Sequence, residues 1–248
     1  MKKVLNNLNI TYRYTKSNSK KSTVLLLHGW GGSLNSFRAI EKQLIDRNYS
    51  VITLDFPGFG GSDTPPESFT MKDYYIIVSE LLREENLTKV DVIGHSFGGR
   101  VAIMLASLEP EKVDRLVLVD SAGIKPKFSL VKQCKILRYK MLKKLKNIGL
   151  IKRDLSTFGS EDYKALPQSM KPVFSQIVKS DLSDFAKNIV APTLLIWGTE
   201  DRDTPMYMAK KLNKLISDSA IIKFENCGHF CYLQKPNDFA EIVINFFE

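Results

Sequence analysis

Residues 89–106 read KVDVIGHSFGGRVAIMLA, and this stretch decides which fold the chain can adopt. Its centre is Gly94-His95-Ser96-Phe97-Gly98, which fits G-x-S-x-G, a turn that lifts a serine from the end of a strand into the start of a helix. The residues before it alternate apolar and polar, with β-branched side chains, which predicts a strand. Those after it are almost wholly apolar, which predicts a buried helix. We therefore expect a strained turn at Ser96, with small neighbours because strand and helix approach closely.

Short apolar strands and amphipathic helices alternate along the rest of the chain. Further strands are expected at residues 10–14, where a hairpin with the preceding segment is one option, and at 24–27, 51–54, 116–119, 193–197 and 220–224. Further helices are expected at residues 34–47, 70–85, 205–215 and 237–247. Ser33 is the expected N-cap of the first of these helices, and a Thr70-x-x-Asp73 box opens the second. Buried strands separated by helices are typical of an α/β fold with a mainly parallel sheet covered on both faces.

The alternation is interrupted in residues 122–190, which carry 15 Lys and Arg side chains against 5 Asp and Glu. This segment holds the whole basic excess of a chain whose net charge is +9. A long basic amphipathic helix is expected over residues 128–150. We predict a core of residues 1–121 and 191–248 and a helical cap, or lid, inserted at 122–190. Weak contact of this basic segment with a membrane surface, or a merely solvated row of lysines, stays open as an alternative.

Composition excludes several classes of protein. The 248 residues are 44% hydrophobic, and no apolar run approaches the ~20 residues of a membrane span. Cys134, Cys227 and Cys231 are too few for a disulfide framework, and no signal peptide is recognised, so a cytoplasmic protein is expected. Residues 227–231 read CGHFC but lack the four ligands of a structural zinc site, so no metal is expected. The basic segment carries no nucleic-acid motif, so no nucleic-acid partner is expected.

A serine hydroxyl becomes a nucleophile when a base takes its proton, and that base is usually a histidine oriented by a carboxylate. The chain has three histidines. His95 is fixed beside Ser96, with its side chain expected to point away from the serine, and His28 lies in a loop after an earlier strand. His229 directly follows the last expected strand. Since α/β sites assemble at the carboxyl ends of strands, His229 is the predicted base.

Three carboxylates are candidates for orienting His229. Asp201 and Asp203 share the loop after one expected strand, and Asp120 ends another. We favour Asp201, with Asp120 and Asp203 as alternatives. The chain order Ser96, Asp201, His229 is the serine–acid–histidine order that accompanies the strained serine turn in one particular fold.

The negatively charged oxygen of a tetrahedral intermediate needs two fixed N–H donors, which form an oxyanion hole. One is expected from the backbone of Phe97, at the start of the helix after the serine. The other is expected from the backbone of Trp30, in the glycine-rich loop of residues 28–32. The side chains of Trp30, Phe97 and Phe230, together with apolar side chains of the cap, are predicted to line an apolar substrate pocket.

These segments together resemble the α/β-hydrolase superfamily over nearly the full length of the chain. The matching pieces are His28-Gly29-Trp30, residues 55–62 (DFPGFGGS), Gly94–Gly98, residues 192–201 (PTLLIWGTED) and Gly228-His229. The resemblance implies an eight-stranded sheet, a cap inserted after the sixth strand, a structural role for the Asp55 segment, and Asp201 as the acid. A serine rather than an aspartate nucleophile argues against dehalogenases and epoxide hydrolases. Gln234, where the family often has glutamate, is a small departure.

The expected function is hydrolysis of a carboxylic ester through an acyl-enzyme, as in a carboxylesterase. Ser96 is the nucleophile, His229 the base and Asp201 its orienter, and no cofactor is expected. The partner is a small-molecule ester or related acyl substrate. Two alternatives stay open: a carbon–carbon bond hydrolase of the meta-cleavage-product type with the same triad, and a hydrolase-like ligand-binding protein with slow turnover. The physiological substrate and the oligomeric state do not follow from the sequence.

Overall fold

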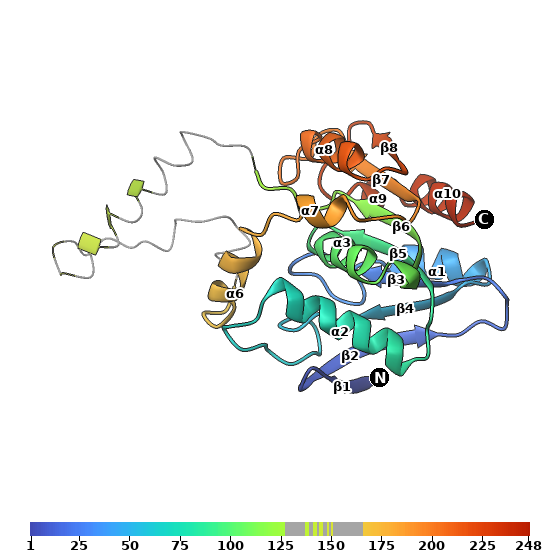
Figure 1. The fold of residues 1–248 in the computed structure, drawn as a ribbon, viewed down its shortest axis with the longest axis horizontal. Coiled ribbons are helices and arrows are strands. Elements are labelled where there is room, and N and C mark those ends of the chain that lie inside the picture. The colour runs from blue at the N-terminus through green and yellow to red at the C-terminus, as the bar shows by residue number, and fades with distance from the viewer. Residues whose placement is uncertain (127–136, 139–140, 143, 146–147, 149, 151–165) are drawn as a thin grey trace.

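The structure is a computed structural model that describes residues 1–126, 137–138, 141–142, 144–145, 148, 150 and 166–248. Eight strands form one central sheet (Figure 1). They are β1 (Lys2–Leu5), β2 (Leu8–Thr15), β3 (Thr23–Leu27), β4 (Ser50–Leu54), β5 (Val90–His95), β6 (Val113–Val119), β7 (Thr193–Gly198) and β8 (Ser219–Phe224). Their order is β1-β2-β4-β3-β5-β6-β7-β8. The β1–β2 hairpin and the β2–β4 pair are antiparallel, and the other pairs are parallel, which confirms the predicted α/β class.

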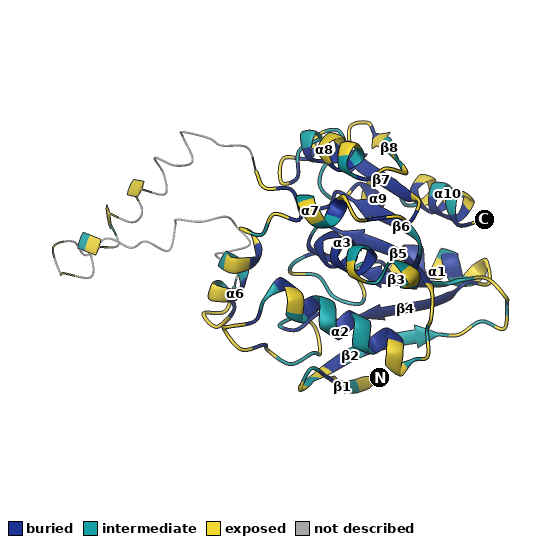
Figure 2. Cartoon of the chain, in the orientation of Figure 1, coloured by how far each residue is buried: buried dark blue, intermediate teal, exposed yellow. Residues whose placement is uncertain are grey.

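Helices cover both faces of this sheet. They are α1 (Arg38–Asp46), α2 (Met71–Glu84), α3 (Phe97–Leu108), α6 (Met170–Ile177), α7 (Ser183–Ala186), α8 (Tyr207–Leu215), α9 (Cys231–Gln234), α10 (Pro236–Phe247) and the 3₁₀ turn Pro110–Lys112. Buried side chains of α2, α3, α6, α7 and α8 belong to one core cluster, and those of α1, α9 and α10 to a second. The sheet therefore separates two hydrophobic cores. Figure 2 shows the strands β3 to β7 buried almost throughout, whereas β1, β2 and β8 are only partly buried.

The strand β3 shows why these apolar runs form a sheet with two buried faces. Leu25 and Leu27 pack into one core cluster, and Val24 and Leu26 pack into the other. All four side chains are fully buried. A strand buried on both sides needs apolar residues at every position rather than at alternate ones, as this sequence provides.

One predicted helix boundary is wrong. Ser33 does not cap α1, which begins at Arg38. The N–H of Leu34 instead donates to Asp55 Oδ1 at 2.6 Å, and the N–H of Ser33 donates to Ser36 Oγ at 3.0 Å. These bonds hold the chain in turns before the helix begins, and the first of them agrees with the structural role expected for the Asp55 segment.

Residues 122–190, the predicted cap, are described in part. The helix expected over 128–150 falls mostly outside the described residues. At the ends of the segment, the N–H of Leu182 donates to the carbonyl of Gly123 at 2.8 Å, and Arg100 Nη1 of α3 donates to the carbonyl of Ser180 at 2.8 Å. α7 accordingly lies against α3 (Figure 1). In the described part of the chain no helix has the length and apolar character that crossing a membrane requires.

Candidate active site

Ser96 lies at the tip of the turn that joins β5 to α3. Its backbone φ of +50° and ψ of −109° lie outside the regions that serine ordinarily adopts, so the turn is strained. The turn is also closely packed against the end of β3. A Cβ atom on Gly98 would overlap the carbonyl oxygen of Leu27 there. The turn therefore needs glycine there, and its geometry presents the Ser96 hydroxyl at the carboxyl edge of the sheet.

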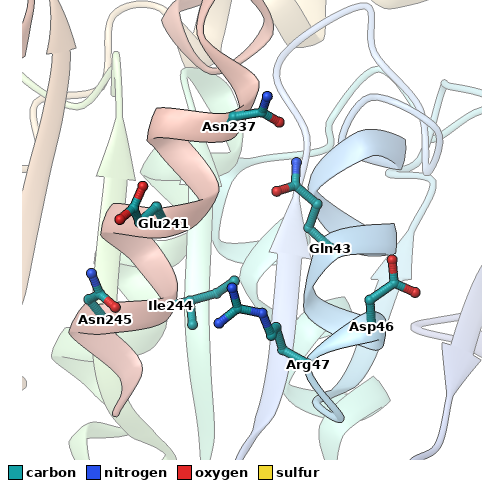
Figure 3. Close-up of a pocket in the computed structure, with 7 residues that line it drawn as sticks. All are labelled: Gln43, Asp46, Arg47, Asn237, Glu241, Ile244 and Asn245. Carbon is teal, nitrogen blue, oxygen red and sulfur yellow. The ribbon is translucent and has the colours of Figure 1, made fainter.

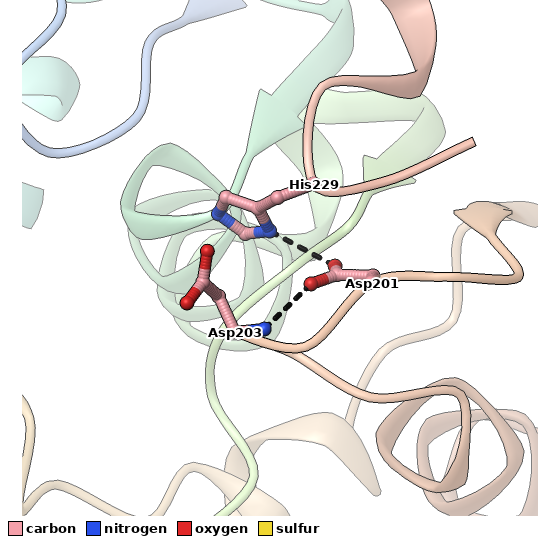
Figure 4. A group of neighbouring side chains, drawn as sticks. All are labelled: Asp201, Asp203 and His229. Atoms are coloured by element: carbon pink, nitrogen blue, oxygen red, sulfur yellow. Dashed lines mark hydrogen bonds and ion pairs between the residues drawn. The ribbon is translucent and has the colours of Figure 1, made fainter.

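The structure brings together Ser96, Asp201 and His229, which are far apart in the sequence. His229 Nε2 lies 3.0 Å from Ser96 Oγ, and His229 Nδ1 lies 2.9 Å from Asp201 Oδ2. Figure 4 shows the second of these contacts. An ionised carboxylate only accepts hydrogen bonds, so Nδ1 carries the proton and Nε2 is left to accept the Ser96 hydroxyl proton. This is the arrangement that a general base requires.

The loop after β7 holds Asp201 in place. Its Oδ1 accepts the backbone N–H groups of Asp203 and Thr204 at 2.8 and 3.0 Å. Its Oδ2 accepts the Thr204 hydroxyl at 2.6 Å beside the bond from His229. A buried carboxylate with four hydrogen bonds is both stabilised and fixed in orientation.

The two alternative acids, Asp203 and Asp120, lie near the Asp201 carboxylate but make other contacts. Asp203 contributes its backbone N–H to the Asp201 carboxylate (Figure 4). Asp120 is buried, and its carboxylate accepts the backbone N–H groups of Gly198 at 2.8 Å and Cys231 at 3.3 Å. The hydrogen bond from the histidine goes to Asp201, which makes Asp201 the best-placed orienter.

Neighbouring charges set the proton affinity of His229. Burial disfavours the charged imidazolium, but the hydrogen bond and charge of Asp201, with the charge of Asp120, outweigh burial and raise the pKa of His229. Burial alone would raise the pKa of Asp201, but its bond to His229 prevails and lowers that pKa. The surroundings therefore favour the imidazolium–carboxylate pair that forms when a serine gives up its proton.

The loop that begins at His28 lies against the serine turn. A Cβ atom on Gly29 would come 2.6 Å from His95 Nδ1, so glycine is what lets this backbone lie so close. His28 braces the loop, because its Nδ1–H donates to the Gly29 carbonyl at 2.7 Å and its Nε2 accepts the N–H of Phe56 at 3.0 Å. Burial lowers the pKa of His28 to about 4, which keeps the ring neutral. Trp30, the expected oxyanion donor, follows directly.

Aromatic rings surround Trp30. Its ring centroid lies 4.9 Å from that of Phe59, 5.1 Å from that of Phe97 and 5.1 Å from that of Phe174. The structure thus brings together two of the three expected pocket residues, whereas Phe230 lies on the histidine side and is half exposed. Phe59 was not among the expected pocket residues, whereas Phe174 is one of the apolar side chains of the predicted cap that were expected there without being named. Phe174 belongs to α6, and nothing local in the sequence connects it with Trp30.

His95 has a role that the motif alone did not reveal. Its Nε2–H donates to the backbone carbonyl of His229 at 2.7 Å, and the two rings lie 4.9 Å apart. Burial lowers the pKa of His95 to about 3, so the ring stays neutral, and its one proton lies on Nε2 because the carbonyl of His229 can only accept. The residue before the serine therefore supports the backbone of the histidine that faces the serine.

Asp201, Asp203 and His229 also offer ligand atoms within 4.8 Å of one another (Figure 4). A cation placed among them would have to displace the proton that His229 Nδ1 donates to Asp201. The hydrogen-bonded geometry is thus better suited to proton transfer than to metal binding, and the expectation that no metal is bound stays a prediction.

A separate surface groove lies between α1 and α10 (Figure 3). Its lining is mostly polar and consists of Gln43, Asp46, Arg47, Asn237, Glu241, Ile244 and Asn245. It includes neither Ser96 nor His229. The groove is therefore separate from the arrangement of Ser96, His229 and Asp201 at the carboxyl edge of the sheet.

The sequence profile of the alpha/beta hydrolase fold matches residues 22–146. The chain is 30% identical over 254 residues to a 2-hydroxy-6-oxononadienedioate/2-hydroxy-6-oxononatrienedioate hydrolase of Klebsiella pneumoniae, with 91% of this chain and 87% of the relative covered. It is 29% identical to the protein of the same name in Escherichia coli K12, with 90% and 86% covered. The chain therefore belongs to the α/β-hydrolase family, and it is a hydrolase.

Solved structures agree on the fold. A meta-cleavage product hydrolase from Pseudomonas fluorescens IP01 superposes with a TM-score of 0.75 at 21% identity, covering 100% of this chain and 97% of that one. An esterase from Exiguobacterium antarcticum superposes with a TM-score of 0.77 at 23% identity, covering 99% and 98%. The same architecture thus carries different substrates, so the substrate has to be argued from the site.

Proposed function

We propose that this protein is a serine hydrolase that cleaves a carbon–carbon bond beside a carbonyl group, in an unsaturated keto acid of the meta-cleavage type. The observation that carries the proposal is the chain of contacts from Asp201 through His229 to Ser96, at 2.9 and 3.0 Å. The choice of bond is supported by the names of the Klebsiella and Escherichia relatives, which align with about nine-tenths of this chain.

Ser96 is the proposed nucleophile. As its Oγ attacks the carbonyl carbon, His229 Nε2 takes the hydroxyl proton, and Asp201 stabilises the imidazolium that results. The carbonyl oxygen becomes an oxyanion, and the backbone N–H groups of Trp30 and Phe97 are the proposed donors to it. The Phe97 donor stands at the start of α3, where the partial positive charge of the helix adds to the stabilisation.

The tetrahedral intermediate then expels a carbon leaving group. The electron pair of the broken bond passes into the conjugated keto system, and His229 returns its proton to the leaving fragment. Water, deprotonated by the same histidine, then attacks the acyl-enzyme, releases the acid and restores Ser96. The carbon is a leaving group only in the keto form of the substrate, which arises when the 2-hydroxy group gives up its proton and the carbon beside the scissile carbonyl gains one. In the dienol form that carbon is vinylic, and its electron pair cannot pass into the conjugated system, so this proton transfer precedes cleavage.

An ester is the second candidate and uses the same triad. Its leaving group is an alkoxide, so the two reactions differ in the atom that receives the proton from His229. The rings of Phe59, Phe97 and Phe174 around Trp30 favour this candidate, because they suit an apolar acyl chain better than the carboxylates of a dioate.

A comparison of kcat/KM on a 2-hydroxy-6-oxodienoate and on p-nitrophenyl esters of graded acyl length tests the choice. The wild-type enzyme should prefer the dienoate, and Ser96→Ala should lose both activities by at least about 10³-fold. Ser107→Ala, which removes a hydroxyl from the far end of the same helix, is the matched control and should keep both. Turnover by Ser96→Ala would refute the serine mechanism, and a preference for esters would refute carbon–carbon cleavage.

We also propose that residues 122–190 form a cap that selects the substrate. The described part of this segment supports the proposal, because Phe174 of α6 contacts Trp30, the residue proposed to bind the oxyanion. The Met170 side chain at the start of α6 packs against Gly58, where a Cβ atom would overlap it. α6 thus lies over the loops that flank the serine.

A further inference from the structure

Asp120 is a buried carboxylate directly after β6, and no step of the proposed reaction uses it. Its side chain is 0% exposed. Its backbone φ of +41° lies in the left-handed region, which Asp and Asn enter more readily than other non-glycine residues. A buried charge and a left-handed backbone both oppose folding, so the contacts of this side chain need an explanation.

The Asp120 carboxylate joins two loops. Its Oδ1 accepts the N–H of Gly198 at 2.8 Å, and its Oδ2 accepts the N–H of Cys231 at 3.3 Å. Gly198 ends β7 and precedes Asp201 by three residues, and Cys231 begins α9 two residues after His229. One side chain therefore spans from the loop of the acid to the loop of the base.

The backbone around Asp120 extends these links to the nucleophile. The Asp120 carbonyl lies 2.9 Å from the Thr204 hydroxyl, which lies 2.6 Å from Asp201 Oδ2. On the other side, the N–H of Ser96 donates to the carbonyl of Val119 at 3.1 Å. Asp120 thus stands where the segments that carry the acid, the base and the serine meet.

We propose that Asp120 is a positioning residue of the triad. Its carboxylate fixes the separation of the Asp201 and His229 loops, and its negative charge stabilises the imidazolium that forms at His229. The inference rests on the function proposed above, because it takes His229 to be the base. Neutralising Asp120 without changing its shape should therefore alter the proton affinity of the base as well as its position.

The titratable groups that face Asp120 are Asp201, His229, Cys231 and Tyr232. Burial, the strongest influence, and the charge of Asp201 raise the pKa of Asp120 to about 6, against the lowering effect of its hydrogen bonds and of His229. In return, the charge of Asp120 is one of the causes that raise the pKa of His229. Above about pH 6 the carboxylate is ionised and can accept both backbone N–H groups.

Asp120→Asn is the test, because asparagine keeps the shape and tolerates the left-handed backbone. Its amide oxygen can still accept the N–H of Gly198, but its NH₂ group would then face the N–H of Cys231. The rate at which a fluorophosphonate probe labels Ser96 should fall about 10- to 100-fold. In a plot of the labelling rate against pH, the fall on the acid side (the acid limb) should move to lower pH. The reason is that the pKa of His229 falls when a neighbouring anion is removed.

Asp114→Asn is the matched control. It removes a carboxylate from the strand β6, which precedes Asp120. Asp114 lies away from the site and pairs with Lys89 at 2.5 Å, so its loss should leave the labelling rate and its acid limb unchanged. A wild-type rate in Asp120→Asn would overturn the inference, and so would a reduced rate with an unmoved acid limb, which a merely structural role predicts. Failure of the wild-type enzyme to label would instead refute the proposed function.

If Asp120→Asn does not fold, as judged by circular dichroism, the wild-type enzyme provides the test. Its activity should require an ionised Asp120 and a neutral His229. Because loss of the Asp120 charge slows labelling about 10- to 100-fold, the logarithm of the labelling rate should fall with a slope that steepens from about one to about two over roughly the first one to two pH units below about pH 6. A slope of about one over the whole acid limb would overturn the inference.

Discussion

The three histidines of the chain differ in charge because their surroundings differ. Burial lowers the pKa of His28 to about 4 and that of His95 to about 3, so both stay neutral and serve as fixed hydrogen-bonding groups. His229 is also largely buried, but Asp201 and Asp120 lie beside it and raise its pKa. The same ring can therefore brace a loop or exchange a proton, depending on whether a carboxylate is within reach.

This difference predicts the pH dependence of the enzyme. As the proposed base, His229 is active only when it is neutral. Its pKa is raised above 6.5, so kcat/KM should fall as the pH drops through a value above 6.5. Asp201→Asn should move this acid limb to lower pH and reduce kcat by roughly 10⁴-fold. The measurement is a pH–rate profile of both proteins, and a wild-type acid limb below pH 6.5 would contradict the assignment.

Asp91 in β5 provides a second prediction at this scale. Both carboxylate oxygens are buried, and neither makes a well-formed hydrogen bond in the described part of the chain. Ser22 and the backbone of Arg115 lie near enough to favour the charged form weakly, and Arg115 Nη1 lies 3.9 Å away. Burial raises the pKa of Asp91 to about 6, above its ordinary 3.8. A carboxyl group whose pKa is raised on folding stabilises the fold only at low pH, and this contribution is lost as the pH rises from about 4 to about 6.

Asp91→Asn should therefore gain stability relative to the wild type over that range. The relative gain in the free energy of unfolding is at most about 3 kcal/mol, from two pKa units at 1.36 kcal/mol each. Urea unfolding of both proteins at pH 4 and pH 7.5 measures it. A difference between the two proteins that does not change with pH would show that Asp91 is not strained by burial.

At the scale of secondary-structure elements, the starts of α1 and α2 show what local sequence can predict. At α2 the expected box is present, since Asp73 Oδ2 accepts the N–H of Thr70 at 2.8 Å three residues away. At α1 the expected cap fails, because the chain after Ser33 is bonded to Asp55, which is remote in sequence. A motif closed within one turn of helix is predictable, whereas a boundary set by a tertiary contact is not.

The capping box predicts a specific loss of stability. Asp73→Ala removes the acceptor for the N–H of Thr70 at the start of α2 and should lower the free energy of unfolding by about 1 kcal/mol. Lys72→Ala, on the exposed side of the same turn, should change it by less than about 0.5 kcal/mol. Thermal unfolding of the two variants makes the comparison, and equal effects would argue that the box does not stabilise the helix.

At the scale of the whole molecule, one sheet supports two cores. Each face of the parallel strands is covered by helices, so neighbouring residues of one strand belong to different clusters. Damage to either cluster removes contacts from the same strands, because the hydrogen-bonded sheet connects them. The two cores should therefore unfold together.

Leu25→Ala and Leu26→Ala test this coupling from adjacent positions of β3. Both side chains are fully buried, and each substitution should lower the free energy of unfolding by about 2–5 kcal/mol. Circular dichroism and tryptophan fluorescence should report one coincident transition in both variants. Val4→Ala, at a largely exposed position of β1, is the control and should cost less than about 0.5 kcal/mol. Separate transitions would mean that the two cores are independent.

Much of the fold and site could be predicted because strong local patterns mark the ends of strands. The apolar runs of β3 to β8 predicted the sheet, and the residues just after β5, β7 and β8 predicted that Ser96, Asp201 and His229 would meet. The roles of His95 and Asp120 depend on which backbone groups they face in space, and no local pattern encodes that. The motifs do not determine the substrate either, because they lie in residues 1–121 and 191–248 and not in the predicted cap.

The contact between His229 and Ser96 joins residues 133 positions apart in the chain. During synthesis, β5 and α3 leave the ribosome and can begin to fold long before β8 is made. On the proposed roles, a nascent chain at that stage presents a nucleophile with neither its acid nor its base. On these proposed roles, hydrolytic activity begins only after β8 has been added to the sheet, and fragments from interrupted translation lack a complete triad.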